Sequence, residues 1–119
     1  MTGGSTIYEG RVEVFINGQW GTVCSDGIGI NEAETLCQSL GFGPYQSIIS
    51  DASFGDSTDI PIVIGDLMCS EDYDHFMKCM YNDLSPVCSV SNLGLQCYRK
   101  SIIFSYIYLK YVSDHDIVY

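Results

Sequence analysis

Six cysteines are the residues in this chain whose chemistry is easiest to recognise. In a chain of 119 residues, six cysteines at long spacings are typical of a disulfide framework formed in an oxidising compartment. No two of them form a Cys-x-x-Cys pair, which argues against a zinc ribbon or finger and against a thioredoxin-type redox motif. The candidate disulfide cysteines are Cys24, Cys37, Cys69, Cys79, Cys88 and Cys97. Their spacing alone leaves the pairing open.

Acidic side chains close to the cysteines are candidate ligands for a cation. Asp26 follows Cys24, Asp66 precedes Cys69, and Asp72 lies between Cys69 and the next cysteine. Hard cations such as Ca²⁺ need several oxygen ligands that converge from rigid loops. Asp26, Asp66 and Asp72 are therefore candidates for a weak Ca²⁺ site, with a solvated acidic surface as the favoured alternative. The sequence implies no other cofactor.

The sequence predicts no catalytic residues. Its two histidines are His75, in a segment between cysteines, and His115, near the C-terminus. No serine lies in a Gly-x-Ser-x-Gly elbow. We therefore expect the chain itself not to be an enzyme. Trp20 is predicted to anchor the core of a hairpin, and ligand stacking is the alternative for this side chain.

The net charge of the chain limits the classes of partner that it can bind. The formal net charge is −10, and before Cys97 the only cations are Arg11 and Lys78. This charge disfavours binding to nucleic acid and to anionic membrane surfaces. It favours cationic partners, or anionic partners held through bridging Ca²⁺. The apolar stretch at 102–111 is too short for a transmembrane helix and contains Lys110, so we expect no direct insertion into a membrane.

A hairpin is predicted at the start of the chain. Val12, Val14 and Ile16 alternate with other residues in a period of two, which is typical of a strand with one buried face. Asn17-Gly18 follows, and this dipeptide is the strongest short signal for a hairpin turn. Residues 19–23 then form the returning strand.

A helix is predicted over residues 31–40. Asn31 is a good N-cap, and Glu34 stands three residues later, as in a capping box. The side chains at positions 33, 36, 37 and 40 lie on one apolar face. Gly41 is placed to end the helix in a left-handed conformation. Cys37 therefore faces the core.

The second half of the chain contains weaker signals. We predict one strand near 46–50, one over 60–68 and one within 90–98. Phe76 and Met77 are expected to pack beneath the segment between Cys69 and Cys79. The chain has no internal repeats, so it forms a single module.

Three segments resemble the N-terminal signatures of the scavenger receptor cysteine-rich domain family, in the right order. They are Gly-Arg-Val-Glu-Val at 10–14, Gly-Gln-Trp-Gly-Thr-Val-Cys at 18–24 and Leu-Cys-Gln-Ser-Leu-Gly-Phe at 36–42. The match continues at Phe54-Gly55, Pro61-Ile62, Cys69-Ser70 and 94–97. It assigns the domain to residues 3–98. Residues 99–119 remain as a C-terminal tail, either a linker-like extension or an extra strand at the sheet edge.

The resemblance implies a fold and a cysteine pairing. The fold is α+β: a curved antiparallel β-sheet cradles one α-helix. Three disulfides cross-link this fold. The implied pairs are Cys24 with Cys88, Cys37 with Cys97, and Cys69 with Cys79.

The resemblance also implies a cation site, from which this chain departs. The family's site uses an acidic pair directly after the position of Cys24 and a Glu in a later loop. Here the pair is Ser25-Asp26, and Tyr73 stands at the position of the Glu, so two carboxylates are absent. We therefore expect weak Ca²⁺ binding or none.

The function implied by the resemblance is that of an extracellular ligand-binding module of scavenger-receptor type, secreted or in the ectodomain of a membrane protein. Its partners would be protein or microbial-surface ligands. The alternative is a non-catalytic structural module of a larger secreted enzyme, such as a protease or lysyl oxidase. Met1-Thr2 stand where the family has a short apolar strand, and the N-terminus lacks the pattern of a signal peptide. We therefore expect a piece of a larger protein with a truncated first strand.

Overall fold

The computed structural model describes residues 1–50, 54, 60–83, 86, 88 and 91–100. Most of the sequence-defined tail, including His115, lies outside the described residues. In chain order the elements are β1 (Thr2–Gly3), β2 (Glu9–Arg11), β3 (Glu13–Ile16), β4 (Gln19–Val23), α1 (Ile30–Ser39), β5 (Tyr45–Ile49), β6 (Ile62–Met68), the 3₁₀-helix η1 (Phe76–Lys78), β7 (Met80–Asn82) and β8 (Gly94–Cys97).

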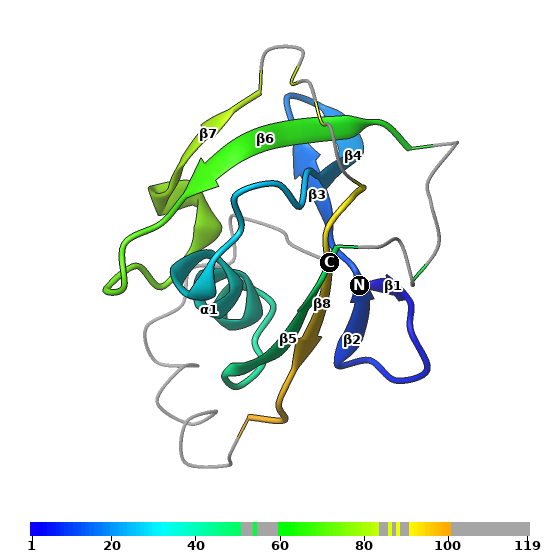
Figure 1. Ribbon diagram of the computed structural model, residues 1–119, viewed down its shortest axis with the longest axis vertical. Coiled ribbons are helices and arrows are strands. Elements are labelled where there is room, and N and C mark those ends of the chain that lie inside the picture. Colours follow the sequence, from blue (N-terminus) through cyan, green and yellow to red (C-terminus); the bar gives the residue numbers. More distant parts are fainter. Residues whose placement is uncertain (51–53, 55–59, 84–85, 87, 89–90, 101–119) are drawn as a thin grey trace.

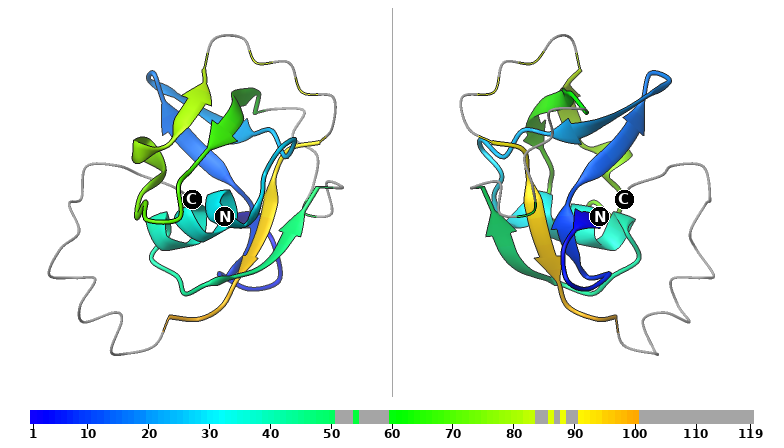
Figure 2. Two further views of the ribbon diagram at one scale, coloured as in Figure 1. Left: turned by 60° about the vertical axis from the view of Figure 1, so that its left-hand side comes forward. Right: turned by 90° about the vertical axis from the view of Figure 1, so that its right-hand side faces the viewer.

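The strands form two four-stranded sheets, with the orders β1-β2-β8-β5 and β3-β4-β6-β7. Helix α1 contacts β5 and β8 of the first sheet and β6 of the second, and Figure 1 shows it below β6 and beside β5. The two further views in Figure 2 show the same helix between the elements of the two sheets. This arrangement confirms the predicted α+β class, with one α-helix among the described residues packed against the sheets.

The prediction of one antiparallel sheet needs a correction, because there are two sheets and strands β4 and β6 pair in parallel. The chain leaves β4, passes through α1 and β5, and returns before it enters β6. Such a long crossover lets the second strand run in the same direction as the first. All other strand pairs that the structure describes are antiparallel.

The predicted hairpin is confirmed in strands β3 and β4. Glu13 pairs with Thr22 and Phe15 with Trp20 across an antiparallel ladder. The turn residues Asn17 and Gly18 have φ angles of 51° and 76°. Positive φ at both central residues is what a type I′ turn requires, which explains the Asn-Gly pair.

The predicted helix is confirmed within one residue, but the predicted cap is wrong. Helix α1 begins at Ile30, and its N-cap is Gly29 in an extended conformation. The carboxylate of Glu32, rather than that of Glu34, accepts the hydrogen bond from the N-cap N–H. Gly41 follows the helix with φ of 83°, as predicted for a residue that ends it.

The core lies between the two sheets and the helix. Helix α1 contributes three apolar residues that are fully buried, and strands from both sheets supply the rest. The largest fully buried side chains of apolar residues are Phe76, Leu36, Ile64, Leu93, Leu95, Val12, Val14 and Val23. The predicted strands near 46–50, over 60–68 and within 90–98 correspond to β5, β6 and β8.

The expectation for Phe76 and Met77 is half right. Phe76 is 1% exposed, and its N–H donates to Ser39 Oγ of α1 over 2.9 Å. Met77, the next residue, is 43% exposed, because one turn of 3₁₀-helix points successive side chains in different directions. Among the described residues, no helix combines the length and the apolar composition that crossing a bilayer requires.

Candidate ligand-binding surface

Three disulfides tie the elements of the fold together. Cys37 of α1 is bonded to Cys97 of β8, with a sequence separation of 60. The bond from Cys24, directly after β4, to Cys88 has a separation of 64, and the bond from Cys69 to Cys79 has a separation of 10. These are the pairs that the family resemblance implies, and no cysteine is left as a thiol.

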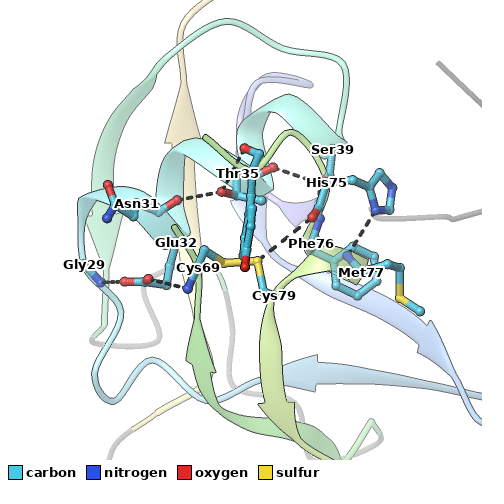
Figure 3. The surroundings of a disulfide bond; sticks show 11 residues. Gly29, Asn31, Glu32, Thr35, Ser39, Cys69, His75, Phe76, Met77 and Cys79 are labelled. Carbon is cyan, nitrogen blue, oxygen red and sulfur yellow. Dashed lines mark hydrogen bonds between the residues drawn. A yellow bond between two sulfur atoms is a disulfide. The ribbon is translucent and has the colours of Figure 1, made fainter. Parts of the chain in front are cut away.

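The carboxylate of Glu32 joins the helix to the shortest disulfide loop. Its Oε1 accepts a hydrogen bond from the N–H of Gly29, and its Oε2 accepts one from the N–H of Cys69, both over 2.8 Å (Figure 3). One side chain therefore caps α1 and holds the first cysteine of the loop closed by Cys69 and Cys79. Sequence analysis missed this residue, although the spacing from Gly29 to Glu32 is that of a capping box.

His75 has a structural role at the other end of this loop. Its Nδ1 accepts a hydrogen bond from the N–H of Met77 over 3.1 Å, which caps the 3₁₀-helix η1 (Figure 3). The N–H groups at the start of a helical turn lack partners within the turn, so such a cap stabilises it. His75 thus orders the disulfide loop.

The three candidate cation ligands are exposed and lie on different segments. Asp26 is in the turn after β4, Asp66 is on β6, and Asp72 is in the turn after Cys69. The described part of the chain contains no group of three or more His, Cys, Asp or Glu side chains arranged to hold a metal ion. A Ca²⁺ site needs several converging oxygen ligands, and these three carboxylates do not form such a group.

We expect Ca²⁺ to bind weakly, with a dissociation constant of about 10⁻⁴ to 10⁻³ M, or not to bind at all. The physical reason is that few carboxylates contribute, so water must fill most coordination positions. Isothermal titration of the oxidised chain with Ca²⁺ measures this affinity, and Asp26→Asn serves as the matched variant. Micromolar affinity that disappears in Asp26→Asn would contradict the prediction.

Trp20 does not anchor the core, so that prediction is wrong. Its side chain is 39% exposed, and its cross-strand neighbour Phe15 is 46% exposed. The two ring centroids lie 5.3 Å apart at an interplanar angle of 55°. Val14 and Ile16 take the core-facing positions of β3, so Phe15 and its partner Trp20 necessarily lie on the outer face. We call these two rings the aromatic surface.

A second exposed apolar surface consists of Met68 and Met80. These residues are directly opposite each other on strands β6 and β7 and are 64% and 72% exposed. They immediately flank the disulfide between Cys69 and Cys79, which fixes both strand ends. We call this pair the methionine surface. Sequence analysis did not identify it, because methionine is more often buried.

Several carboxylates lie close to Met68 in the sequence. Four of them are exposed, one on β6 and three in the loop between Cys69 and Cys79. They are Asp66, Glu71, Asp72 and Asp74. The only cation of this segment, Lys78, forms an ion pair with Asp74. The hydrogen bond from Lys78 holds the pKa of Asp74 below its usual value.

A depression of about 290 Å³ lies beside the tip of the β3–β4 hairpin, with Ile16, Pro61 and Asp83 among its lining residues. Sites for small molecules usually have volumes of about 300 Å³ or more and enclose most of their ligand. This depression is at the lower limit of that range. The two exposed apolar surfaces are therefore better candidates for recognition, and they suit contact with a macromolecule.

Comparisons with known proteins place the chain in a family. The family model for the scavenger receptor cysteine-rich domain matches residues 2–98. Among solved structures, the third such domain of murine neurotrypsin superposes with a TM-score of 0.70 at 31% sequence identity, over 85% of this chain and 95% of that one.

Two curated relatives show the kinds of protein in which such a domain occurs. The macrophage scavenger receptor types I and II of Mus musculus is 36% identical over 99 residues, which are 82% of this chain and 21% of that protein. Lysyl oxidase homolog 2 of Homo sapiens is 34% identical over 98 residues, which are 82% of this chain and 12% of that protein. The chain thus spans a small part of the length of these relatives. By its cysteine pairing, its fold and these matches, the chain belongs to the scavenger receptor cysteine-rich domain family.

Proposed function

We propose that this chain is an extracellular ligand-binding module of scavenger-receptor type, which mediates recognition of proteins or microbial surfaces. The observation that carries the proposal is the exposure of two apolar surfaces on a scaffold closed by three disulfides. Aromatic residues are enriched where proteins bind one another, and Phe15 and Trp20 are held on a short hairpin with a tight turn. The likeness to a macrophage scavenger receptor supports this role.

The rigidity of the scaffold supports binding rather than catalysis. A surface that is already ordered loses little conformational entropy when a partner docks. Two of the three disulfides lie at the ends of the strands that present these side chains, since Cys24 directly follows β4 and the bond between Cys69 and Cys79 joins the end of β6 to the start of β7. The preformed surfaces therefore support the proposed role of a binding module.

A binding panel tests this function. The oxidised chain is immobilised and exposed to heat-killed bacteria, to lysozyme as a cationic protein and to dextran sulfate as a polyanion. We expect saturable binding to the bacteria or to lysozyme, and none to dextran sulfate, because the chain carries a net charge of −10. The reduced and alkylated chain is the matched control and should not bind.

Two results would contradict the proposal. The first is an absence of binding to all three probes. The second is equal binding by the oxidised chain and by the reduced and alkylated chain, because such binding would not depend on the folded surfaces.

A second candidate function is that of a structural module in a larger secreted enzyme. The likeness to lysyl oxidase homolog 2, of which the match covers 12%, is the observation that favours it. The full-length transcript around this segment separates the two functions. An oxidase or protease domain in the same reading frame would favour the structural role, and a membrane anchor without an enzyme domain would favour the receptor role.

A further inference from the structure

The methionine surface is an apolar area whose exposure the fold itself maintains. Met68 and Met80 are cross-strand partners on the outer face of β6 and β7, and β7 is the last strand of its sheet. The residues directly before Met68 and Met80, Leu67 and Cys79, are buried, whereas the two methionines are largely exposed and so lie outside the core. Contiguous exposed apolar side chains mark interaction sites more often than isolated ones do, and Met68 and Met80 are adjacent on one sheet face.

The base of this surface is rigid. The disulfide between Cys69 and Cys79 joins the residues that directly follow Met68 and precede Met80. The N–H of Cys69 is held by Glu32, and the N–H of Phe76 is held by Ser39 (Figure 3). Methionine side chains are themselves flexible and polarizable, so they adapt to apolar groups of different shapes. The surface thus combines a fixed backbone with adaptable side chains.

The charge around the methionine surface selects the chemistry of its partner. Asp66, Glu71 and Asp72 are exposed carboxylates for which no cation in this segment remains, since Lys78 pairs with Asp74. An exposed apolar pair with exposed carboxylates close by in the sequence is complementary to a segment that carries leucine or aromatic side chains on one face and lysine or arginine on the other. A second copy of this chain is disfavoured, because each copy has a net charge of −10.

We propose that the methionine surface, Met68 and Met80, docks a cationic amphipathic segment of a partner protein, and that the carboxylates of Asp66, Glu71 and Asp72 attract its basic residues without a bridging metal ion. This inference rests on the proposed ligand-binding function and assigns a site and a class of partner to it. The apolar contact supplies affinity, and the carboxylates orient the partner and make its binding sensitive to salt.

The test uses a synthetic helical peptide with leucine on one face and lysine on the other. A peptide of the same composition in scrambled order, without an apolar face, is its control. We expect the amphipathic peptide to bind the oxidised chain more tightly than the scrambled peptide in the presence of a chelator. Titration calorimetry at two salt concentrations measures the affinity and its salt dependence.

Three variants locate the site. The double variant Met68→Gln with Met80→Gln keeps the length of the side chains and removes their apolar character, and it should weaken binding about tenfold, or about 1.4 kcal/mol. The double variant Met68→Leu with Met80→Leu should bind as the native chain does. Ile7→Gln is the matched control, since Ile7 is 69% exposed on the segment before β2 in the other sheet, and it should change nothing.

A further double variant, Glu71→Gln with Asp72→Asn, removes two of the carboxylates. This change should weaken binding and reduce its salt dependence. All substituted positions are exposed, so the variants should unfold at the same denaturant concentration as the native chain, and that measurement verifies their folding.

The outcomes separate this inference from the proposed function. If the glutamine variant binds as the native chain does while Phe15→Ser abolishes binding, the site lies on the aromatic surface and the inference is wrong, but the function stands. The same holds if the peptide does not bind while the bacteria or lysozyme do. If neither the peptide nor the probes of the panel bind, both proposals are wrong.

Discussion

Replacing Cys37 and Cys97 together by alanine should lower the free energy of unfolding by about 4 kcal/mol. The disulfide between them joins α1 to β8 across 60 positions of sequence, so its loss frees a large part of the unfolded chain. Both cysteines are buried, at 0% and 3% exposure, and the smaller alanine side chains also leave some space in the core. Denaturation by guanidinium chloride measures the loss. A domain of this size is typically stable by only about 5–15 kcal/mol, so the effect should be large.

The shortest disulfide is the internal control for this expectation. The double variant Cys69→Ala with Cys79→Ala opens a loop with a separation of only 10 and should cost about 3 kcal/mol in the same chain-entropy treatment. The difference between the two variants reports the contribution of loop length. If the Cys37 and Cys97 variant proved as stable as the native chain, the helix would be held by packing alone and the expectation would be refuted.

Local sequence signals predicted the elements near the N-terminus because those elements are specified locally. The Asn17-Gly18 dipeptide can form a type I′ turn whatever surrounds it, and positive φ angles are found at both residues. Gly41 ends the helix for a similar reason. The alternation of Val12, Val14 and Ile16 placed one face of the chain in the core before any tertiary contact was known.

The same register contained information that the prediction for Trp20 did not use. A two-residue turn at Asn17-Gly18 pairs Phe15 with Trp20, and residues directly opposite each other lie on the same face of a ladder. Because Val14 and Ile16 face the core, Phe15 faces outward and Trp20 must follow it. The outward position of Trp20 was therefore predictable from this register.

The methionine surface could not be predicted from local patterns. Strand β6 has an irregular register between Gly65 and Met68, and Asp66 has a φ angle of 54°. A residue in the left-handed region interrupts the regular alternation of a strand. The side of the sheet on which Met68 lies therefore depends on a backbone irregularity that the sequence pattern does not indicate. Asp66, one of the candidate cation ligands, lies in the same irregular part of β6. Its surroundings could therefore not be predicted from residue spacing either.

Replacing Glu32 by alanine should lower the free energy of unfolding by about 2 kcal/mol. The carboxylate accepts two hydrogen bonds of 2.8 Å, from the N–H groups of Gly29 and Cys69. Hydrogen bonds to a charged group contribute about 1.5–3 kcal/mol each, and the partly exposed position reduces their combined effect. Chemical denaturation monitored by circular dichroism measures the change.

Glu34 supplies the matched control, because it lies on the same helix and was the residue that the sequence pattern favoured as part of the cap. Among the described residues, its Oε1 accepts one hydrogen bond, from the N–H of Tyr45 over 3.2 Å, so Glu34→Ala should cost about 0.5–1 kcal/mol. Glu32→Gln should be intermediate, since an amide offers one oxygen and turns an NH₂ group toward the second N–H. Equal losses at both glutamates would show that Glu32 acts only as a helix residue. A larger loss at Glu32 is the expected result, because Glu32 both caps the helix and holds the N–H of Cys69 across 37 positions of sequence.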